Sequence, residues 1–278
     1  MEQISNDKIL IVTVLYNQRL TDTNVYKSLL VNFPYVYIQD NSSDSKDRVR
    51  NEQLPENWVY VAAPENPGLS KAYNSAARYA REKSINWIII ADQDTVFPVD
   101  YIDKVREAIL EDREKLLVPV VKLENGLVLS PAKRMGYFPK MSRTIPSGRL
   151  KLRDYAIINS GMAVKTELFE ETGGYNEKVF LDMSDVQFLE RVANLYPHAK
   201  VISACCLQNF SAASDKGDKQ IARFSLFCRS VRNYESTRKG GGIMIGGVVL
   251  KRMLNLVIST RRLKPVRIYI QEYLRGKR

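Results

Sequence analysis

The stretch KILIVTVLY (residues 8–16) decides the fold class, because it is nearly continuous in Val, Ile and Leu. A strand that is buried on both faces has this composition, and such strands belong to parallel sheets covered by helices. The next segment, residues 21–33, opens with helix start signals and places Val25, Leu29 and Leu30 on one side. A strand followed by an amphipathic helix predicts an α/β protein built from βαβ units.

Outward from this strand, apolar runs alternate with amphipathic stretches along most of the chain. The stretch 129–149 is rich in Gly, Pro and Arg and predicts a mobile loop. The glycine run at 240–247 predicts a hinge before a C-terminal tail. Further strands are expected at residues 35–39, 58–63, 87–91, 116–122, 155–164 and 200–207, and helices at residues 70–83, 99–113, 185–195 and 219–239.

Length and composition exclude several classes of protein. With 278 residues, of which 45% are apolar, the chain can bury a substantial core, so disorder and fibrous repeats are excluded. Three cysteines without a CxxC pair specify neither a disulfide framework nor a zinc site and indicate buried free thiols. No apolar run reaches the roughly 18 to 20 residues that span a bilayer, and the first residues lack a signal-peptide core, so a cytoplasmic location is expected.

The histidine content restricts the chemistry. The sequence contains one histidine, His198, which is expected at the surface. Mechanisms that need a histidine base or several histidine ligands are therefore nearly excluded. Carboxylates must carry any acid–base chemistry.

Three acidic residues follow apolar strands directly. Asp40 comes after YVYIQ, and Asp92 and Asp94 come after WIIIA. In an open parallel sheet the ligand crevice lies at the carboxyl ends of the strands, so these carboxylates are expected to converge there. Asp92 and Asp94 project to the same side of an extended segment. Such a pair suits a hard cation that also binds substrate phosphates, which predicts a metal–diphosphate ligand.

The order of motifs along residues 8–191 carries a family resemblance. LIVTVLYN, IQDNSSD, ENPGLSKAYNSA and WIIIADQDTVFP are followed by NSGMAVKTELFEETGGYNEKVFLDMSDVQFLER. This order resembles the family two inverting glycosyltransferases, especially their bacterial rhamnosyltransferase-like branch. The resemblance implies the α/β GT-A fold, a Rossmann-like nucleotide-binding sheet flanked by helices. It implies a catalytic domain over 1–210, divided into a nucleotide-sugar half (1–115) and an acceptor-side half (116–210).

The resemblance also implies roles for individual residues. Asp40 matches the acid that recognises the nucleotide base, Asp92 the ribose-side acid of the DxD motif, and Asp94 the residue that coordinates Mg²⁺ or Mn²⁺. Ser160 and Gly161 fall in the acceptor-side block. The expected nucleotide-sugar contacts are Thr13, Asn17, Asp40, Asn66, Gly68, Lys71, Asp92 and Gln93.

Inverting transfer needs a base that takes the proton of the acceptor hydroxyl, and a carboxylate can serve. The base of the family lies six residues before the arginine that closes the motif, and counting back from Arg191 gives Asp185. Asp182 is the second candidate. A competing interpretation makes Ser184 or Asp185 the N-cap of the following helix, although capping and catalysis are compatible.

One departure from the family weakens the metal assignment. Many relatives carry a histidine after the next strand, where this chain has CCLQNFSA and offers Gln208. Either Gln208 takes a polar role near the metal, or Asp94, phosphates and water hold it alone.

The expected function is sugar transfer from a nucleotide-sugar, with dTDP-rhamnose favoured and a UDP-hexose next, to a glycan acceptor in bacterial surface polysaccharide (O-antigen or capsule) synthesis. The alternative is a non-catalytic nucleotide-sugar or polysaccharide-binding protein that keeps the fold. A dinucleotide-binding G-x-G-x-x-G motif and a P-loop are absent from the sequence. A two-carboxylate glycoside hydrolase is disfavoured, because hydrolysis does not require nucleotide-binding strand ends.

The basic region 211–278 is expected to be helical. Residues 239–278 hold 10 Lys and Arg against one acidic residue, out of a net charge of +11. Apolar residues such as Leu250, Leu254 and Ile258 recur at helical spacing among these charges, which is typical of a helix lying on an anionic membrane surface. We expect a peripheral enzyme whose acceptor is linked to polyprenyl diphosphate. We do not expect nucleic acid as a partner. Docking to a partner or to a second copy as a homodimer is the alternative.

Overall fold

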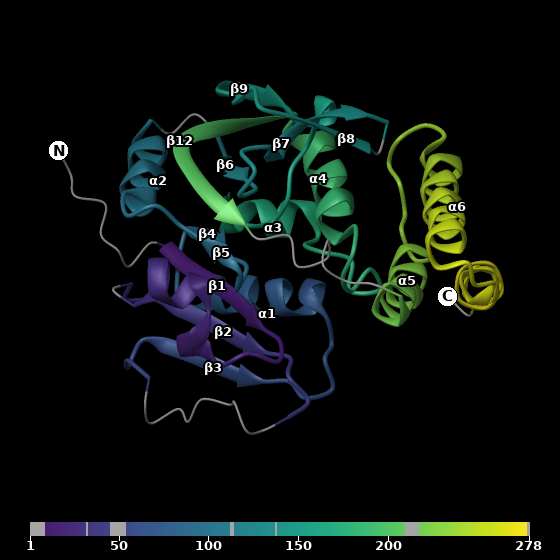
Figure 1. Ribbon diagram of the computed structural model, residues 1–278. Helices are drawn as coiled ribbons and strands as arrows, with labels where there is room; N and C mark the ends of the chain where they lie inside the picture. The colour runs from purple at the N-terminus through teal and green to yellow at the C-terminus, as the bar shows by residue number, and fades with distance from the viewer. Residues whose placement is uncertain are drawn as a thin grey trace.

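One mixed sheet organises the computed structural model, which describes residues 9–31, 33–44, 54–111, 114–136, 138–208 and 217–276. Its main path runs β10-β7-β6-β11-β4-β1-β2-β3, and β12 joins it beside β6 (Figure 1). The strands are β1 (Ile9–Leu15), β2 (Val36–Asp40), β3 (Trp58–Ala62), β4 (Trp87–Ile90), β5 (Thr95–Val96), β6 (Leu116–Lys122), β7 (Val128–Met135), β8 (Phe138–Ser142), β9 (Gly148–Lys151), β10 (Tyr155–Ala156), β11 (Met162–Lys165) and β12 (His198–Gln208).

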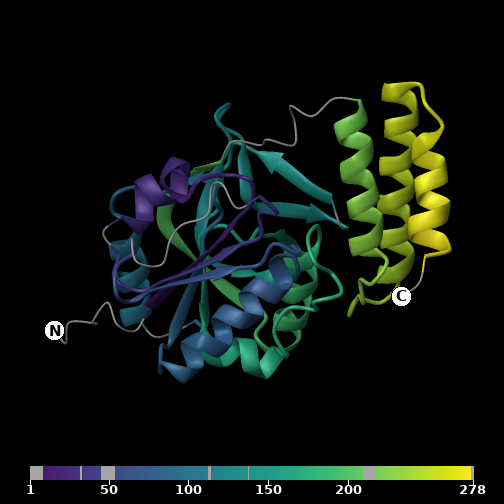
Figure 2. The same ribbon diagram turned by 90° about the horizontal axis from the view of Figure 1, so that it is seen from below.

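The expected central strand is confirmed as β1. All seven of its residues are buried, and it pairs in parallel with β2 and β4. Side chains on one face pack against α1, α3 and α4, and those on the other face pack against η3 and α2. Figures 1 and 2 show helices on both sides of the sheet. Continuous apolar composition follows from this double burial. The chain therefore has the expected α/β fold.

Helices cover both faces of the sheet and form a further layer at the C-terminal end. The α-helices are α1 (Leu69–Glu82), α2 (Tyr101–Leu110), α3 (Thr166–Thr172), α4 (Ser184–Leu195), α5 (Asp218–Val231), α6 (Gly241–Thr260) and α7 (Lys264–Ile268). The shorter helical turns are η2 (Leu20–Asp22), η3 (Tyr26–Leu30), η5 (Leu152–Asp154) and η7 (Tyr269–Leu274).

Two expectations for the middle of the chain are wrong. The stretch 129–149 is not a loop, because β7 pairs with β6 and β8, and β9 pairs with β12. The expected single strand at 155–164 is two strands, β10 and β11, separated by a turn. Gly161 in that turn has φ +77°, a conformation that other residues rarely adopt. Pairing with distant strands overrides the local turn composition in the first case.

The C-terminal helices α5, α6, α7 and η7 form a layer beside the main body (Figures 1 and 2). Phe224 and Phe227 of α5 pack against buried Ile245, Val249 and Met253 of α6. The expected glycine hinge is wrong, because α6 already begins at Gly241. Burial of the apolar residues against α5 offsets the low helix propensity of the glycines. The expected boundary at 210/211 lies outside the described residues.

The membrane expectation also needs correction at α6. By length and composition, this helix could cross a bilayer, with a mean hydropathy of 1.5 over its apolar window. Buried helices of soluble proteins meet the same criterion, and 28% of that window is buried here. Of the three cysteines, Cys206 and Cys228 are buried as expected, whereas Cys205 is exposed.

Candidate functional site

The DxD segment lies at the carboxyl end of β4, beside the turn that leads into β11. The Asp92 N–H donates to Ser160 Oγ (3.3 Å), and Ser160 Oγ shares a hydrogen bond with Thr95 Oγ1 (2.7 Å). The Gly161 N–H donates to the Ile90 carbonyl (2.7 Å). A Cβ at Gly161 would lie 2.5 Å from Pro119 Cγ. In this structure, the expected acceptor-side pair therefore positions the DxD segment.

Three carboxyl groups gather at this place. Burial, together with the charges of Asp94 and Asp185, raises the pKa of Asp92 to about 7. Burial also raises the pKa of Asp94, while a hydrogen bond from Gln208 and the charge of Arg223 oppose that rise. Two acids from the turn after β4 and one from α4 thus share an electrostatic environment, whereas the convergence expected from the strand ends concerned Asp40, Asp92 and Asp94. Clusters of this kind are typical of functional sites.

Asp185 is the second residue of α4. Burial raises its pKa to about 6, against the lowering effects of a hydrogen bond from the Val186 N–H (2.7 Å) and the charge of Arg134. The competing interpretation of Ser184 or Asp185 as the N-cap is not supported, because the N-cap position is Met183, with φ +70° and no side-chain cap. Asp185 lies in the first turn of α4, where the helix dipole favours a negative charge.

Sequence reasoning missed two groups that act on these acids. The hydroxyl of Tyr73, on α1, lowers the pKa of Asp92 through a hydrogen bond. Arg134, on β7, is the counter-charge for Asp185. The helical spacing of Tyr73 indicated only a core position, and Arg134 falls within the stretch expected to be a loop. No sequence pattern around either residue indicated that it would lie beside these acids.

Gln93 joins the ends of two strands. Its side chain accepts from the Tyr16 N–H (2.9 Å) and donates to the Tyr16 carbonyl (3.4 Å). Asn17 follows with φ +52°, and its N–H donates to Ser42 Oγ (2.7 Å). These contacts give Gln93 a structural role beside the nucleotide contact expected from the sequence.

Asp40 is almost fully enclosed, with 1% of its surface exposed. Its carboxylate accepts from the Ser42 N–H (2.9 Å) and the Tyr60 hydroxyl (2.5 Å). Thr13 on the neighbouring strand is also buried, and its Oγ1 has no hydrogen-bond partner among the described residues. The two residues are placed at the carboxyl half of β1 and β2, and their nucleotide roles stay predictions.

The NPG motif at the start of α1 contacts the segment that leads from α3 to α4. Gly68 has φ +90°, and a Cβ there would lie 2.4 Å from the Phe180 carbonyl oxygen. The Leu69 N–H donates to that same oxygen (2.7 Å). Asn66 and Lys71 are exposed. The sequence predicted nucleotide contacts for these residues but not the close approach of Gly68 to Phe180.

We call residues 174–184 the strap, since they lead from the end of α3 to α4. On the α1 side, the Asn74 amide pairs with both backbone groups of Tyr175, at 2.8 and 2.9 Å. On the side of the C-terminal helices, Ser230 Oγ donates to the Asp182 carbonyl (3.1 Å). Asp182 also forms an ion pair with Arg252 (3.8 Å). The strap is therefore held from both sides.

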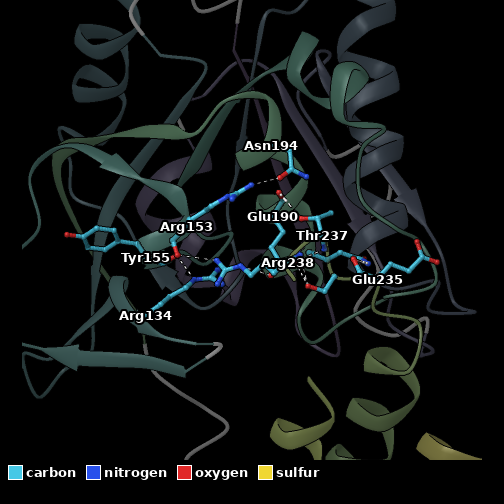
Figure 3. Close-up of polar contacts among 10 residues, drawn as sticks. Arg134, Arg153, Tyr155, Glu190, Asn194, Glu235, Thr237 and Arg238 are labelled. Carbon is cyan, nitrogen blue, oxygen red and sulfur yellow. Dashed lines mark hydrogen bonds and ion pairs between the residues drawn. The ribbon is translucent and has the colours of Figure 1, made fainter. Parts of the chain in front are cut away.

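The segment between α5 and α6 is anchored to α4 by polar contacts (Figure 3). Glu190 has a side chain that is 1% exposed and pairs with Arg238 Nε (3.0 Å). Its other oxygen accepts from Ser236 Oγ (3.1 Å). Arg134 Nε donates to the Tyr155 carbonyl (2.5 Å), so this arginine is fixed beside the same helix. Breaking a buried pair of this kind leaves an uncompensated charge, which is costly.

The donor set at Asp92 and Asp94 fits a hard divalent cation. Two nearby carboxylates with raised pKa values carry negative charge that a cation would offset. Gln208 Nε2 donates to Asp94 Oδ1 (3.2 Å), and the buried Gln208 Oε1 has no hydrogen-bond partner among the described residues. No group of three or more His, Cys, Asp or Glu side chains suited to a metal occurs within those residues. Mg²⁺ commonly takes only one or two carboxylates, with phosphates and water completing its shell.

His198 lies away from the position expected for the family histidine. It begins β12, pairs with Lys151 of β9 and is partly buried rather than fully exposed. The end of the same strand carries Gln208 next to Asp94. Of the two alternatives that the sequence leaves open, a polar role for Gln208 near the metal fits this contact with Asp94.

Comparisons with known proteins agree with this arrangement. The model of the Glycosyl transferase family 2 matches residues 10–173, more than half of the chain. The chain is 28% identical over 211 residues to the dTDP-rhamnosyl transferase RfbF of Shigella flexneri, covering 72% of this chain and 70% of RfbF.

Solved structures show the same fold. The structure of S. aureus TarS 1-349 in complex with UDP-GlcNAc matches with a TM-score of 0.54 at 14% identity, covering 95% of this chain and 78% of that chain. The complex of the same protein with UDP gives a TM-score of 0.51 at 15% identity, with coverage of 92% and 71%. The fold is GT-A, as expected.

The contact of Gly68 with Phe180 predicts a specific loss of stability. Gly68→Ala adds a methyl group against a backbone oxygen, whereas Gly126→Ala has a similar φ (+81°) with nothing within 4 Å of its Cβ. Both variants carry the cost of alanine at positive φ. We expect Gly68→Ala to lower the free energy of unfolding by about 1–3 kcal/mol more than Gly126→Ala does. Urea denaturation measures the difference, and equal losses would show that the contact carries no strain.

Proposed function

The chain belongs to glycosyl transferase family 2, and we propose that it is an inverting, metal-assisted enzyme that transfers a sugar from a nucleotide-sugar donor. The convergence of Asp92, Asp94 and Asp185 is the observation that carries the proposal. The similarity to a dTDP-rhamnosyl transferase favours dTDP-rhamnose as donor, with a UDP-hexose next. The acceptor proposed is a lipid-linked glycan of bacterial surface polysaccharide (O-antigen or capsule).

In this mechanism Asp185 is the base. Its pKa of about 6 leaves the carboxylate mostly ionised at neutral pH and still basic enough to accept a proton. The acceptor hydroxyl loses its proton to Asp185 as its oxygen attacks the anomeric carbon, and the bond to the diphosphate breaks on the opposite face. Arg134 limits the rise of the Asp185 pKa, which keeps the ionised form available.

The donor site is proposed at the carboxyl ends of β1, β2 and β4. Asp40 binds the nucleotide base, with Thr13, Asn17 and Lys71 as further contacts. Asp94, assisted by Asp92 and Gln208, would hold Mg²⁺ or Mn²⁺. The cation supplies charge that stabilises the leaving diphosphate. A non-catalytic binding protein with this fold would bind the same donor and lack turnover.

Nucleotide binding tests the donor class. We expect UDP or dTDP to raise the thermal midpoint of unfolding, and Mn²⁺ to increase that shift, because a ligand that binds only the folded state stabilises it. Asp94→Ala should remove the Mn²⁺-dependent increment, while Asp103→Ala on the exposed side of α2 should keep it. Absence of stabilisation by UDP, dTDP and GDP, with or without metal, contradicts the proposal.

Turnover distinguishes the two candidate bases. We expect Asp185→Asn to lower kcat by about two to four decades, because the proton acceptor is lost while the donor site is intact. Turnover of the unmodified enzyme should fall as the pH drops through about 6, where Asp185 becomes protonated. Asp182→Asn should cause a smaller loss. Near-normal kcat in Asp185→Asn together with an inactive Asp182→Asn would transfer the role to Asp182.

We also propose that the enzyme is cytoplasmic and peripheral on the membrane, through the outer side of α6. Ile243, Leu250, Leu254 and Ile258 form one exposed stripe along this helix, and they are 84, 42, 48 and 75% exposed. Arg261, Arg262 and Lys264 are exposed at the end of the helix. An apolar stripe with basic residues at its border is typical of an interfacial helix. The opposite side of α6 packs on α5, which supports a helix on the surface rather than across the bilayer.

Liposome co-sedimentation tests this placement in the full chain. Each basic residue near an anionic surface contributes about 1 kcal/mol, so binding should require anionic lipid and decrease with salt. Leu254→Glu with Ile258→Glu should abolish binding, whereas Val99→Glu with Leu110→Glu adds the same charge just before α2 and at its last residue and should not. Equal binding by the two double variants, or a stable dimer that buries α6 in solution, contradicts the membrane proposal.

A further inference from the structure

The C-terminal helices contact the strap through its backbone as well as its side chains. Ser230, near the end of α5, accepts from the Leu181 N–H (3.3 Å) and donates to the Asp182 carbonyl (3.1 Å). Asn233 Nδ2 donates to the Lys178 carbonyl (3.1 Å). These bonds fix the conformation of the last residues before α4.

Arg252 adds a contact from α6. Its guanidinium lies 4.2 Å from the centre of the Phe227 ring and 3.8 Å from Asp182 Oδ2. The Arg252 and Asp182 side chains are 35% and 23% exposed. Asp182 Oδ2 has no hydrogen-bond partner among the described residues. The positive charge of Arg252 therefore compensates the negative charge of this oxygen. Partial burial makes this compensation stronger than that of an ion pair in water.

The residue between Asp182 and α4 is strained. Met183 has φ +70°, a left-handed conformation that is unfavourable for a residue with a Cβ. Such a conformation persists only where surrounding contacts determine it. Because Met183 is the N-cap of α4, its geometry sets the direction in which the helix starts. That direction places Asp185, two residues farther on.

We propose that Arg252 and Ser230 are positioning residues for catalysis, which hold Asp182 and Met183 so that Asp185 faces Asp92 and Asp94. The inference rests on the proposed role of Asp185. Small displacements of a reacting group can cost on the order of a hundredfold in rate. The C-terminal helices then take part in catalysis and do not serve only to attach the enzyme to a surface.

Steady-state kinetics of the full chain test the proposal. Arg252→Gln should lower kcat about tenfold or more, with an unchanged Kd for the donor nucleotide, and Arg252→Lys should restore most of the loss because it keeps the charge. Ser230→Ala should act in the same direction. Arg267→Gln removes one exposed charge from the same layer and should match the unmodified enzyme. Because Arg252 acts through Asp182, the losses in Arg252→Gln and Asp182→Asn should not add.

Several results would overturn the inference. One is a kcat for Arg252→Gln equal to that of Arg267→Gln, and another is full additivity with Asp182→Asn. A third is a parallel fall of kcat, donor affinity and thermal midpoint, which a merely structural role produces. If Asp185→Asn is inactive while Arg252→Gln is normal, the positioning role alone fails. If Asp185→Asn is fully active, the proposed base fails instead.

Discussion

The arrangement of the site depends on the attachment of the strap to α1. Gly68 lets the start of α1 approach the Phe180 carbonyl, and the Leu69 N–H bonds to that oxygen. Asn74, one turn farther along α1, pairs with Tyr175 at the other end of the strap. These contacts join α1 to the segment that carries Asp182 and leads to Asp185.

The same arrangement stores unfavourable electrostatic energy. Burial and mutual repulsion raise the pKa of Asp92 to about 7 and burial raises that of Asp185 to about 6, so ionised carboxylates destabilise the folded protein at neutral pH. For a raised acid pKa, the penalty is present above the folded value and disappears as the pH falls toward the unfolded one. A bound cation or a proton taken from an acceptor reduces this penalty. The site is therefore suited to bind positive charge and accept protons.

Much of the fold was predictable from the sequence, because apolar runs such as residues 8–16 reflect burial on both faces of a parallel sheet. Asp92, Asp94 and Asp185 were identified as candidate site residues from their motifs. The roles of Arg134 and Arg252 were not predictable, because they depend on which distant elements meet. The glycines at the start of α6 led to a wrong prediction of a hinge. Packing of Ile245 and Val249 on α5 outweighs the low helix propensity of these glycines. Long-range packing therefore accounts for what the sequence pattern missed.

Hydrogen–deuterium exchange of the full chain tests most directly whether α1 and the C-terminal helices hold the strap together. The account predicts that amides of residues 174–187 exchange slowly in the unmodified protein. Asn74→Ala should speed their exchange and leave β1 protected, because local opening does not require global unfolding. Rapid exchange of the strap in the unmodified protein, or no change in Asn74→Ala, would contradict the account.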